Sequence, residues 1–223
     1  MTWFINPYID DESTPPITPG DVIIGSGTTN FRDAPVAYYY DNSYSGIFLT
    51  PSQLSGIPNG ATITKIEFET ELLTNGTYSK IDVNKYMYQV PATFTSFPSN
   101  CRVNGYSSTD TTYNNAINNY QQVDSLADMT IVKISSHPNV MWRGFNFVSP
   151  YQNFDNTQNL CIIFNCLDSD YAPGSQTYPR IKSTFGTYTR AFYNDKRDNS
   201  PYNLTDFVNF QASYFPNIRI HYE

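Results

Sequence analysis

Short hydrophobic runs separated by turn residues make up most of this chain. Valine, isoleucine, threonine, tyrosine and phenylalanine dominate the runs, and helical periodicity is nearly absent. Fifteen prolines and eleven glycines stand between the runs, and both residues are typical of connections. We therefore expect an all-β protein of about ten short strands. The predicted strands are Val22–Gly25, Pro35–Tyr40, Gly46–Leu49, Ile63–Thr70, Lys80–Gln89, Thr130–Ile134, Trp142–Val148, Leu160–Cys166, Ala191–Tyr193 and Pro216–Tyr222.

Two of these strands indicate how the sheets pack. In Ile63–Thr70, Ile66 and Phe68 share one face while charged side chains occupy the other, which is typical of an antiparallel strand with one side in water. Leu160–Phe164 is continuously apolar, as a strand covered on both faces would be. Many short strands joined by long turns favour a two-sheet antiparallel β-sandwich of the jelly-roll type.

Residues 1–20 differ from the rest and are predicted to form an extended N-terminal arm, because their proline-rich second half is typical of a stiff spacer. The head of this arm contains four aromatic or apolar residues, Trp3, Phe4, Ile5 and Tyr8. We expect the head to be a partner interface, since such side chains often anchor protein contacts. No break in composition divides the remainder, so residues 21–223 are predicted to form a single β-sandwich domain.

Two further segments carry local signals. The stretch from Ser107 to Asp128 is long and polar, which predicts a surface loop or a weak helix. Thr50-Pro51-Ser52-Gln53 has the spacing of a capping box with proline at the first helical position. We therefore expect one short turn of helix there.

Composition and charge exclude several classes of protein. Charged residues make up 15% of the chain and aromatic residues 16%, the reverse of what a disordered chain contains. The net charge of −7 predicts no nucleic-acid partner, because such partners need a basic surface. No apolar run approaches the roughly 18 residues of a membrane-spanning helix, so we expect no membrane partner. The N-terminal residues show no basic region, apolar region or cleavage site typical of an export signal, so we expect synthesis in a reducing cytoplasm.

The three cysteines are predicted to be reduced residues of the core. An odd number of cysteines at irregular spacing is not a disulfide framework. Cys161 and Cys166 are five residues apart in one extended run. They therefore point to opposite faces of a strand and lie too far apart to form a disulfide.

Few residues of this chain could perform catalysis. His137 lies in a turn-like segment and His221 in the last predicted strand. The sequence contains no Gly-x-Ser-x-Gly nucleophile elbow, no zinc-ligand spacing and no phosphate-binding loop. We therefore predict no catalytic residues, no cofactor and no bound metal, and hence no enzyme. Asp168 and Asp170 follow a core strand, where sandwich loops often hold calcium, but they supply few of the about six oxygen ligands that calcium needs.

A tyrosine-rich segment is the most informative feature of the surface. Its four tyrosines are Tyr38, Tyr39, Tyr40 and Tyr44. Successive residues of a strand face opposite sides, so at least one ring faces water or a partner. Tyrosine suits such half-buried surfaces, because it offers a large contact area with a polar tip. We expect a glycan or partner surface here; the alternative is that the rings lie flat on the sheet as part of its packing.

Several motifs occur in a recognisable order along the chain. They are Tyr38–Leu54, Ile63–Phe68, Lys80–Met87, Asp128–Val132, Trp142–Phe147, Phe154–Leu160, Arg190–Asp195 and Phe215–Ile220. In this order they resemble a β-sandwich module that is widespread in Bacteroidota surface proteins. The resemblance implies a jelly-roll sandwich.

Exported members of that family are multidomain and carry a signal peptide and a sorting domain, whereas this chain is expected to be a lone module with an arm. It is in this respect similar to virion structural proteins of crAss-like bacteriophages. That likeness implies a non-enzymatic capsid auxiliary (decoration) protein or head-fibre subunit. Such a protein is made in the host cytoplasm, resides in the virion, forms a homo-oligomer and docks on other virion proteins through its arm. The alternative is a carbohydrate-binding adhesion module that recognises host polysaccharide.

Overall fold

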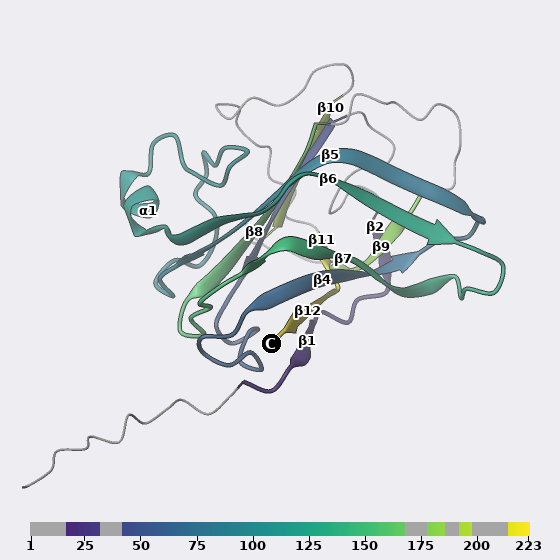
Figure 1. The fold of residues 1–223 in the computed structure, drawn as a ribbon. Coiled ribbons are helices and arrows are strands. Elements are labelled where there is room, and N and C mark those ends of the chain that lie inside the picture. The colour runs from purple at the N-terminus through teal and green to yellow at the C-terminus, as the bar shows by residue number, and fades with distance from the viewer. Residues whose placement is uncertain (1–16, 32–41, 168–177, 186–191, 198–213) are drawn as a thin grey trace, which may run out of the picture.

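Two antiparallel β-sheets pack face to face in the described part of the chain (Figure 1). The computed structural model describes residues 17–31, 42–167, 178–185, 192–197 and 214–223. The predicted all-β, two-sheet antiparallel sandwich is confirmed. No helix among these residues is long and apolar enough to cross a membrane.

One sheet has seven strands within the described ranges. They are β1 (Gly20–Ile24), β2 (Thr29–Phe31), β4 (Ile63–Glu71), β7 (Val140–Tyr151), β9 (Arg180–Phe185), β11 (Tyr214–Pro216) and β12 (Ile218–Tyr222). β4 lies at its centre, with β7 along one side and β12 followed by β9 along the other. β1 pairs with the free side of β12, while β2 and β11 both pair with β9.

The second sheet has five strands among the residues described. They are β3 (Asn42–Leu49), β5 (Gly76–Val90), β6 (Asn118–Lys133), β8 (Asn159–Cys166) and β10 (Phe192–Arg197). Their order is β10-β3-β8-β5-β6, so β8 is the central strand. β5 and β6 form a long hairpin-like pair at one side of this sheet (Figure 1).

The main core fills the space between the two sheets. Ile66 and Phe68 of β4 face inward, as their alternation with charged residues predicted. They belong to the same cluster as Ile162 and Phe164 of β8. The rings of Phe68 and Phe164 meet edge to face, with centroids 5.8 Å apart. Each such side chain stabilises the fold by about 1.5–3 kcal/mol when it is fully buried.

A second core covers the opposite face of the five-stranded sheet. Cys161 of β8 and Tyr88 of β5 pack there against Tyr113, which belongs to the short helix α1 (Thr111–Ala116). The segment 91–117, which contains α1, therefore lies over this face of the sheet (Figure 1). β8 is buried along its whole length, which confirms the prediction made from its apolar run.

The cysteines divide between the two cores. Cys101 and Cys161 belong to the second core and Cys166 to the main core. All three are buried and free. The prediction of reduced core cysteines, with Cys161 and Cys166 on opposite faces of one strand, is confirmed.

The prediction of a loop or weak helix from Ser107 to Asp128 is wrong for its second half. Only α1 is helical, and β6 already begins at Asn118. The pairing of β5 with β6 shifts register at several points, and β6 has an extra residue between Asp124 and Ala127, which stand opposite Lys85 and Val83. An extra residue in one strand moves the side chains that follow it to the other face of that strand. The apolar and polar residues of β6 therefore do not alternate regularly, and the sequence predicted only its last part, within Thr130–Ile134.

The strands β2 and β9 were missed, and one predicted strand lies outside the described residues. β2 is only three residues long, and β9 reads Arg-Ile-Lys-Ser-Thr-Phe, so neither has a distinctive hydrophobic pattern. The predicted strand Pro35–Tyr40 falls outside the described ranges.

The predicted capping turn is present, because Leu54 N–H donates to the Thr50 carbonyl at 3.2 Å. Gln53 Oε1 accepts the Thr50 N–H at 2.9 Å.

The side chain of Asn217 fixes the connection between β1 and β2. Its Oδ1 accepts the N–H of Gly27 at 2.9 Å, and its Nδ2 donates to the Gly27 carbonyl at 2.8 Å. Nδ2 also donates to Glu69 Oε2 at 2.7 Å. A Cβ at Gly27 would lie 2.1 Å from the Ser183 carbonyl oxygen, so only glycine allows this close approach.

A buried ion pair connects the two sheets along one side. Lys85 of β5 pairs with Asp124 of β6, and both side chains are almost completely buried. Asp124 Oδ1 also accepts the backbone N–H of Val148 in β7 at 2.7 Å. One carboxylate therefore joins β5 and β6 of one sheet to β7 of the other.

We predict that Asp124→Ala lowers the free energy of unfolding by about 3–5 kcal/mol, because it leaves a buried lysine without its counter-ion. Urea unfolding at neutral pH measures this change. Asp128→Ala is the matched control, since Asp128 is an exposed carboxylate of the same strand, and we expect it to change stability by less than about 0.5 kcal/mol. Equal effects of the two substitutions would contradict the role given to Asp124.

Candidate functional site

The outer face of the seven-stranded sheet carries charged residues in register across neighbouring strands. His221 of β12 stands opposite Asp21 of β1 and Lys65 of β4. In the next row, Arg219 stands opposite Glu67. We call the following group the ionic face: Asp21, Lys65, Glu67, Trp142, Arg219 and His221.

Glu67 is the centre of the ionic face. Its Oε1 lies 2.7 Å from Lys65 Nζ. Its Oε2 lies 3.2 Å from Arg219 Nη1 and 2.9 Å from His221 Nε2. Asp21 contributes a further carboxylate 3.8 Å from the guanidinium of Arg219. Charges of both signs therefore form a continuous network across β1, β12 and β4.

The surroundings of Glu67 determine its protonation. Burial alone would raise its pKa, but the hydrogen bonds and the positive charge of Lys65 and His221 outweigh burial and lower the pKa below its ordinary value. Glu67 is therefore an ionised carboxylate at neutral pH. A carboxylate held in this way is a poor general acid and a good fixed acceptor.

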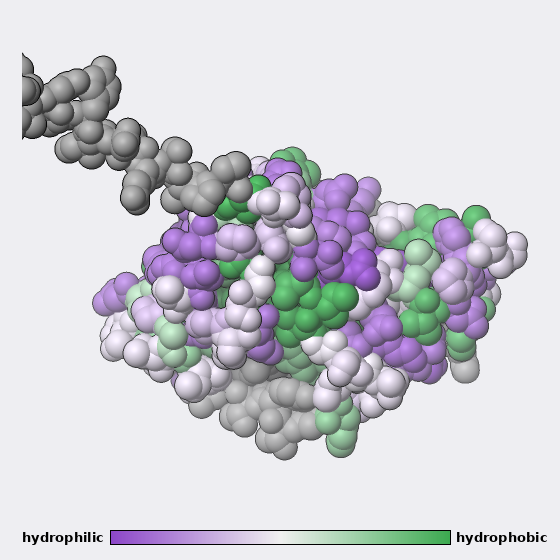
Figure 2. All heavy atoms as spheres, turned by 90° about the horizontal axis from the view of Figure 1, so that it is seen from below, coloured by the Kyte–Doolittle hydropathy of each residue, from purple (hydrophilic) through white to green (hydrophobic). Residues whose placement is uncertain are grey.

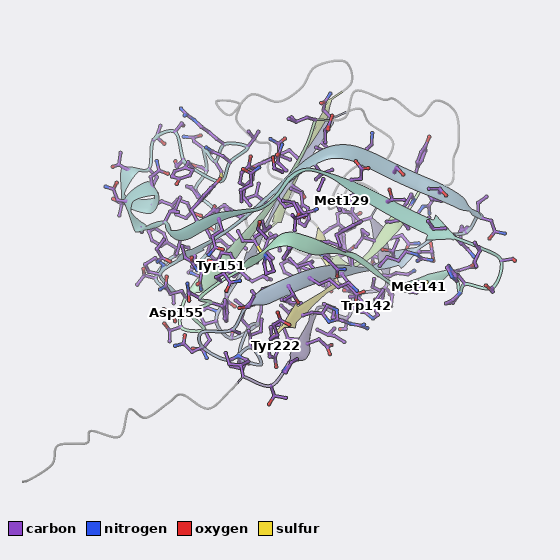
Figure 3. All side chains as sticks on the ribbon, viewed as in Figure 1. Met129, Met141, Trp142, Tyr151, Asp155 and Tyr222 are labelled. Atoms are coloured by element: carbon purple, nitrogen blue, oxygen red, sulfur yellow. The ribbon has the colours of Figure 1, made fainter. Side chains whose placement is uncertain are left out.

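Trp142 of β7 borders the ionic face. The guanidinium of Arg219 lies over its ring, 4.5 Å from the centroid. Trp142 and Met141 lie near one end of β7 and Tyr151 at the other (Figure 3). Between them Gly144 stands opposite Glu67, where a Cβ would lie only 2.6 Å from Glu67 Cγ. The missing side chain at Gly144 leaves room for Glu67 to lie along the sheet.

Apolar surface accompanies these charges. Ile23 of β1 stands opposite Arg219 and is 53% exposed. The space-filling view from below likewise shows hydrophobic residues among hydrophilic ones (Figure 2). A partly exposed tryptophan, an arginine and an aliphatic side chain on a broad sheet favour contact with another molecule.

A tyrosine cluster lies at the border of the second core. It consists of Tyr86, Tyr106 and Tyr120, all partly exposed. The Tyr120 ring lies 5.8 Å from that of Tyr86 and 5.4 Å from that of Tyr106, centroid to centroid. Its hydroxyl donates to the Asn104 carbonyl at 3.1 Å. Next to it, the exposed Gln122 donates to Asn84 Oδ1 at 3.0 Å.

Tyr44 was expected on a glycan or partner surface, and its placement there is wrong. The side chain is completely buried in the second core. Its hydroxyl donates to the carbonyl of Arg102, which belongs to the segment that covers this face of the sheet. Alternation along the strand could not reveal that segment, because the cover comes from a distant part of the chain.

The other predicted binding residues lie outside the described ranges. They are the arm residues Trp3, Phe4, Ile5 and Tyr8, the tyrosines Tyr38, Tyr39 and Tyr40, and the calcium candidates Asp168 and Asp170. Their roles therefore stay predictions. The described residues contain no group of three or more His, Cys, Asp or Glu side chains that could hold a metal ion.

The two histidines have separate places. His137 lies in the turn between β6 and β7, as predicted, and its carbonyl accepts from Lys133 Nζ at 3.1 Å. His221 belongs to the ionic face, which was not foreseen from the sequence. The alternation of Lys65 and Glu67 did predict a charged face on β4. What the pattern could not show is that Trp142 and Arg219 meet beside it.

Comparison of the chain with protein-family models, with curated proteins and with solved structures gives no match. The function must therefore be argued from the fold and from the two surfaces described above.

We predict that Glu67 stabilises the fold above its ordinary pKa of 4.5, and that this contribution is lost as the pH falls through the lowered pKa of the folded state. The difference in unfolding free energy between the wild type and Glu67→Gln should therefore shrink between neutral pH and about pH 3. Urea unfolding at a series of pH values measures it. Asp128→Asn, at an exposed carboxylate, serves as the control. A difference that stays constant with pH would contradict the network.

Proposed function

We propose that this chain is a non-enzymatic structural protein of a virion, either a capsid decoration protein or a head-fibre subunit. It works by docking on other virion proteins after synthesis in the host cytoplasm. The observation that carries the proposal is the stacking of Arg219 on Trp142 within the ionic face. Trp and Arg are the side chains whose truncation at interfaces most often costs about 2 kcal/mol or more.

The base of the arm supports this proposal. Ile17 packs against the main core, and β1 then pairs with β12, which contributes Arg219 and His221 to the ionic face. The arm therefore joins the sandwich at the same sheet that carries this face. A partner that binds both features gains from their linkage, and repetition of the contact over a particle multiplies a modest affinity.

We predict that removal of residues 1–16 abolishes incorporation into particles and leaves the unfolding temperature unchanged, because every described contact is retained. Particles made from a phage genome that lacks this reading frame are incubated with purified protein, sedimented and analysed for bound chain. We expect Trp142→Ala to weaken the binding about tenfold or more, as for a hot-spot tryptophan.

Val148→Ala is the matched control, since Val148 is the exposed apolar residue of the same strand β7. Wild-type occupancy by the shortened chain would overturn the role of the arm. Absence of the chain from particles made with the intact genome would overturn the proposed function itself.

The tyrosine cluster favours a second candidate function, the recognition of host polysaccharide. Sugar rings stack on aromatic faces, and their hydroxyls exchange hydrogen bonds with amides. Tyr86 and Tyr120 offer partly exposed rings, and Gln122 offers an exposed amide beside them. This cluster takes the place of the Tyr38–Tyr44 segment as the surface to test, because Tyr44 is buried. Both functions are compatible, since a fibre can also bind sugar.

We predict that a glycan array detects saturable binding to a polysaccharide of the host surface, and that Tyr86→Ala weakens it about tenfold. Tyr222→Ala is the control, because Tyr222 is a partly buried tyrosine of the other sheet. Titration calorimetry measures both affinities. If the chain binds no glycan on the array, or if both substitutions lower the affinity equally, this candidate function is excluded.

A further inference from the structure

Lys85 of β5 is buried among apolar side chains of the main core, with only 1% of its surface exposed. Val83 and Met87, which flank it on the same face of β5, both belong to this core. Across the sheet, Lys85 stands opposite Phe164 of β8, another residue of the core. From the other sheet, the centroid of the Phe145 ring lies 5.6 Å from Lys85 Nζ. Apolar groups therefore enclose the amine on several sides.

Asp124 of β6 provides the one hydrogen-bond acceptor for this amine among the described residues. Lys85 Nζ contacts Asp124 Oδ2, and β5 and β6 run side by side here (Figure 1). The other carboxylate oxygen, Oδ1, accepts the backbone N–H of Val148 at 2.7 Å. An ammonium group has three N–H donors, so two of them find no acceptor in the part of the chain that is described. The charge of Lys85 is therefore poorly solvated.

Two other lysine–carboxylate pairs lie in wetter places. The side chains of Lys65 and Glu67 are 31% and 10% exposed, and those of Lys182 and Glu71 are 16% and 15% exposed. The side chains of Lys85 and Asp124 are only 2% and 1% exposed. Burial of two ions carries a large desolvation cost, which their mutual attraction offsets only in part. Of the three pairs, this one gains most from a reaction that removes both charges.

A lysine and an aspartate in contact can condense to an amide. A proton first passes from Lys85 Nζ to Asp124 Oδ2, which gives a neutral amine and a carboxylic acid. The amine then attacks Cγ, and the N–H of Val148 stabilises the negative charge that develops on Oδ1. The Cγ–Oδ2 bond breaks, and Oδ2 leaves as water with the transferred proton and a second proton from nitrogen. Permanent contact of the two groups replaces a collision step and so gives them a high effective concentration.

We propose that Lys85 and Asp124 form an intramolecular isopeptide bond after the chain has folded, and that their ion pair is the reactant. Oδ1 becomes the amide oxygen and keeps its hydrogen bond with Val148. The bond joins two residues 39 positions apart, and the loop that it closes contains the segment 91–117 over the second core. The cross-link therefore ties both ends of this cover to the sheet beneath it.

This cross-link suits a chain made in a reducing cytoplasm. Disulfides do not persist there, and the three cysteines are free. The condensation transfers no electrons and needs no oxidant. The proposal does not depend on whether the chain resides in a virion.

Mass spectrometry of the full chain, denatured after purification at neutral pH, tests the proposal. We expect the wild type to be lighter than its sequence by the mass of one water molecule. Digestion should release a branched peptide that joins the segment around Lys85 to the segment around Asp124, with no trypsin cleavage after Lys85. Lys85→Met and Asp124→Ala should each have the full mass of their sequence, because each variant lacks one of the two reacting groups.

Lys182→Met is the matched control, since Lys182 also pairs with a carboxylate, Glu71, but on the outer face of the other sheet. This variant should keep the loss of one water molecule. A wild-type chain with the full mass of its sequence overturns the proposal. So does a mass loss that persists in Lys85→Met, or one that the digest places at other residues. The wild-type mass and its branched peptide decide the question even if Lys85→Met does not fold. Neither result bears on incorporation into particles, so this proposal and the proposed function can fail separately.

Discussion

Burial of β8 on both faces is the constraint on which the rest of this fold depends. Its eight residues are all buried, so two separate layers of protein must cover it. The seven-stranded sheet supplies one layer through Phe68, which meets Phe164. The segment 91–117 supplies the other through Tyr113, which lies against Cys161. A strand of this kind cannot present a binding surface of its own.

This constraint decides where contact with other molecules can occur. One face of the five-stranded sheet is used by the main core, and much of the other lies beneath the segment 91–117. No segment of the described ranges covers the outer face of the seven-stranded sheet around Trp142 and Arg219, which are partly exposed. Glu67 keeps that face ordered, because one carboxylate fixes cations from two strands. A pre-ordered polar face loses little side-chain freedom when a partner binds.

How far the sequence predicts this structure depends on how local each signal is. The alternation around Ile66 and the apolar run of β8 predicted the sandwich, because both depend only on neighbouring residues. The first part of β6 was missed because extra residues in this strand break the alternation. Tyr44 was misplaced because the segment that buries it lies far away in the chain. The contact between Trp142 and Arg219 could not be predicted from the sequence either, since it depends on the order of β7, β4 and β12 in the sheet.

The pairing of β1 with β12 sets a mechanical path through the molecule. Tension applied ahead of Gly20 enters the sandwich through an antiparallel ladder that runs from the Gly20–Tyr222 pair to the Ile24–Ile218 pair. Just beyond this ladder, the side chain of Asn217 holds the chain through its two hydrogen bonds with the backbone of Gly27. In a protein held by its N-terminal arm, a pulling force would therefore act first on the β1–β12 pair at the edge of the seven-stranded sheet. The buried strand β8 belongs to the other sheet and would not carry this force at first.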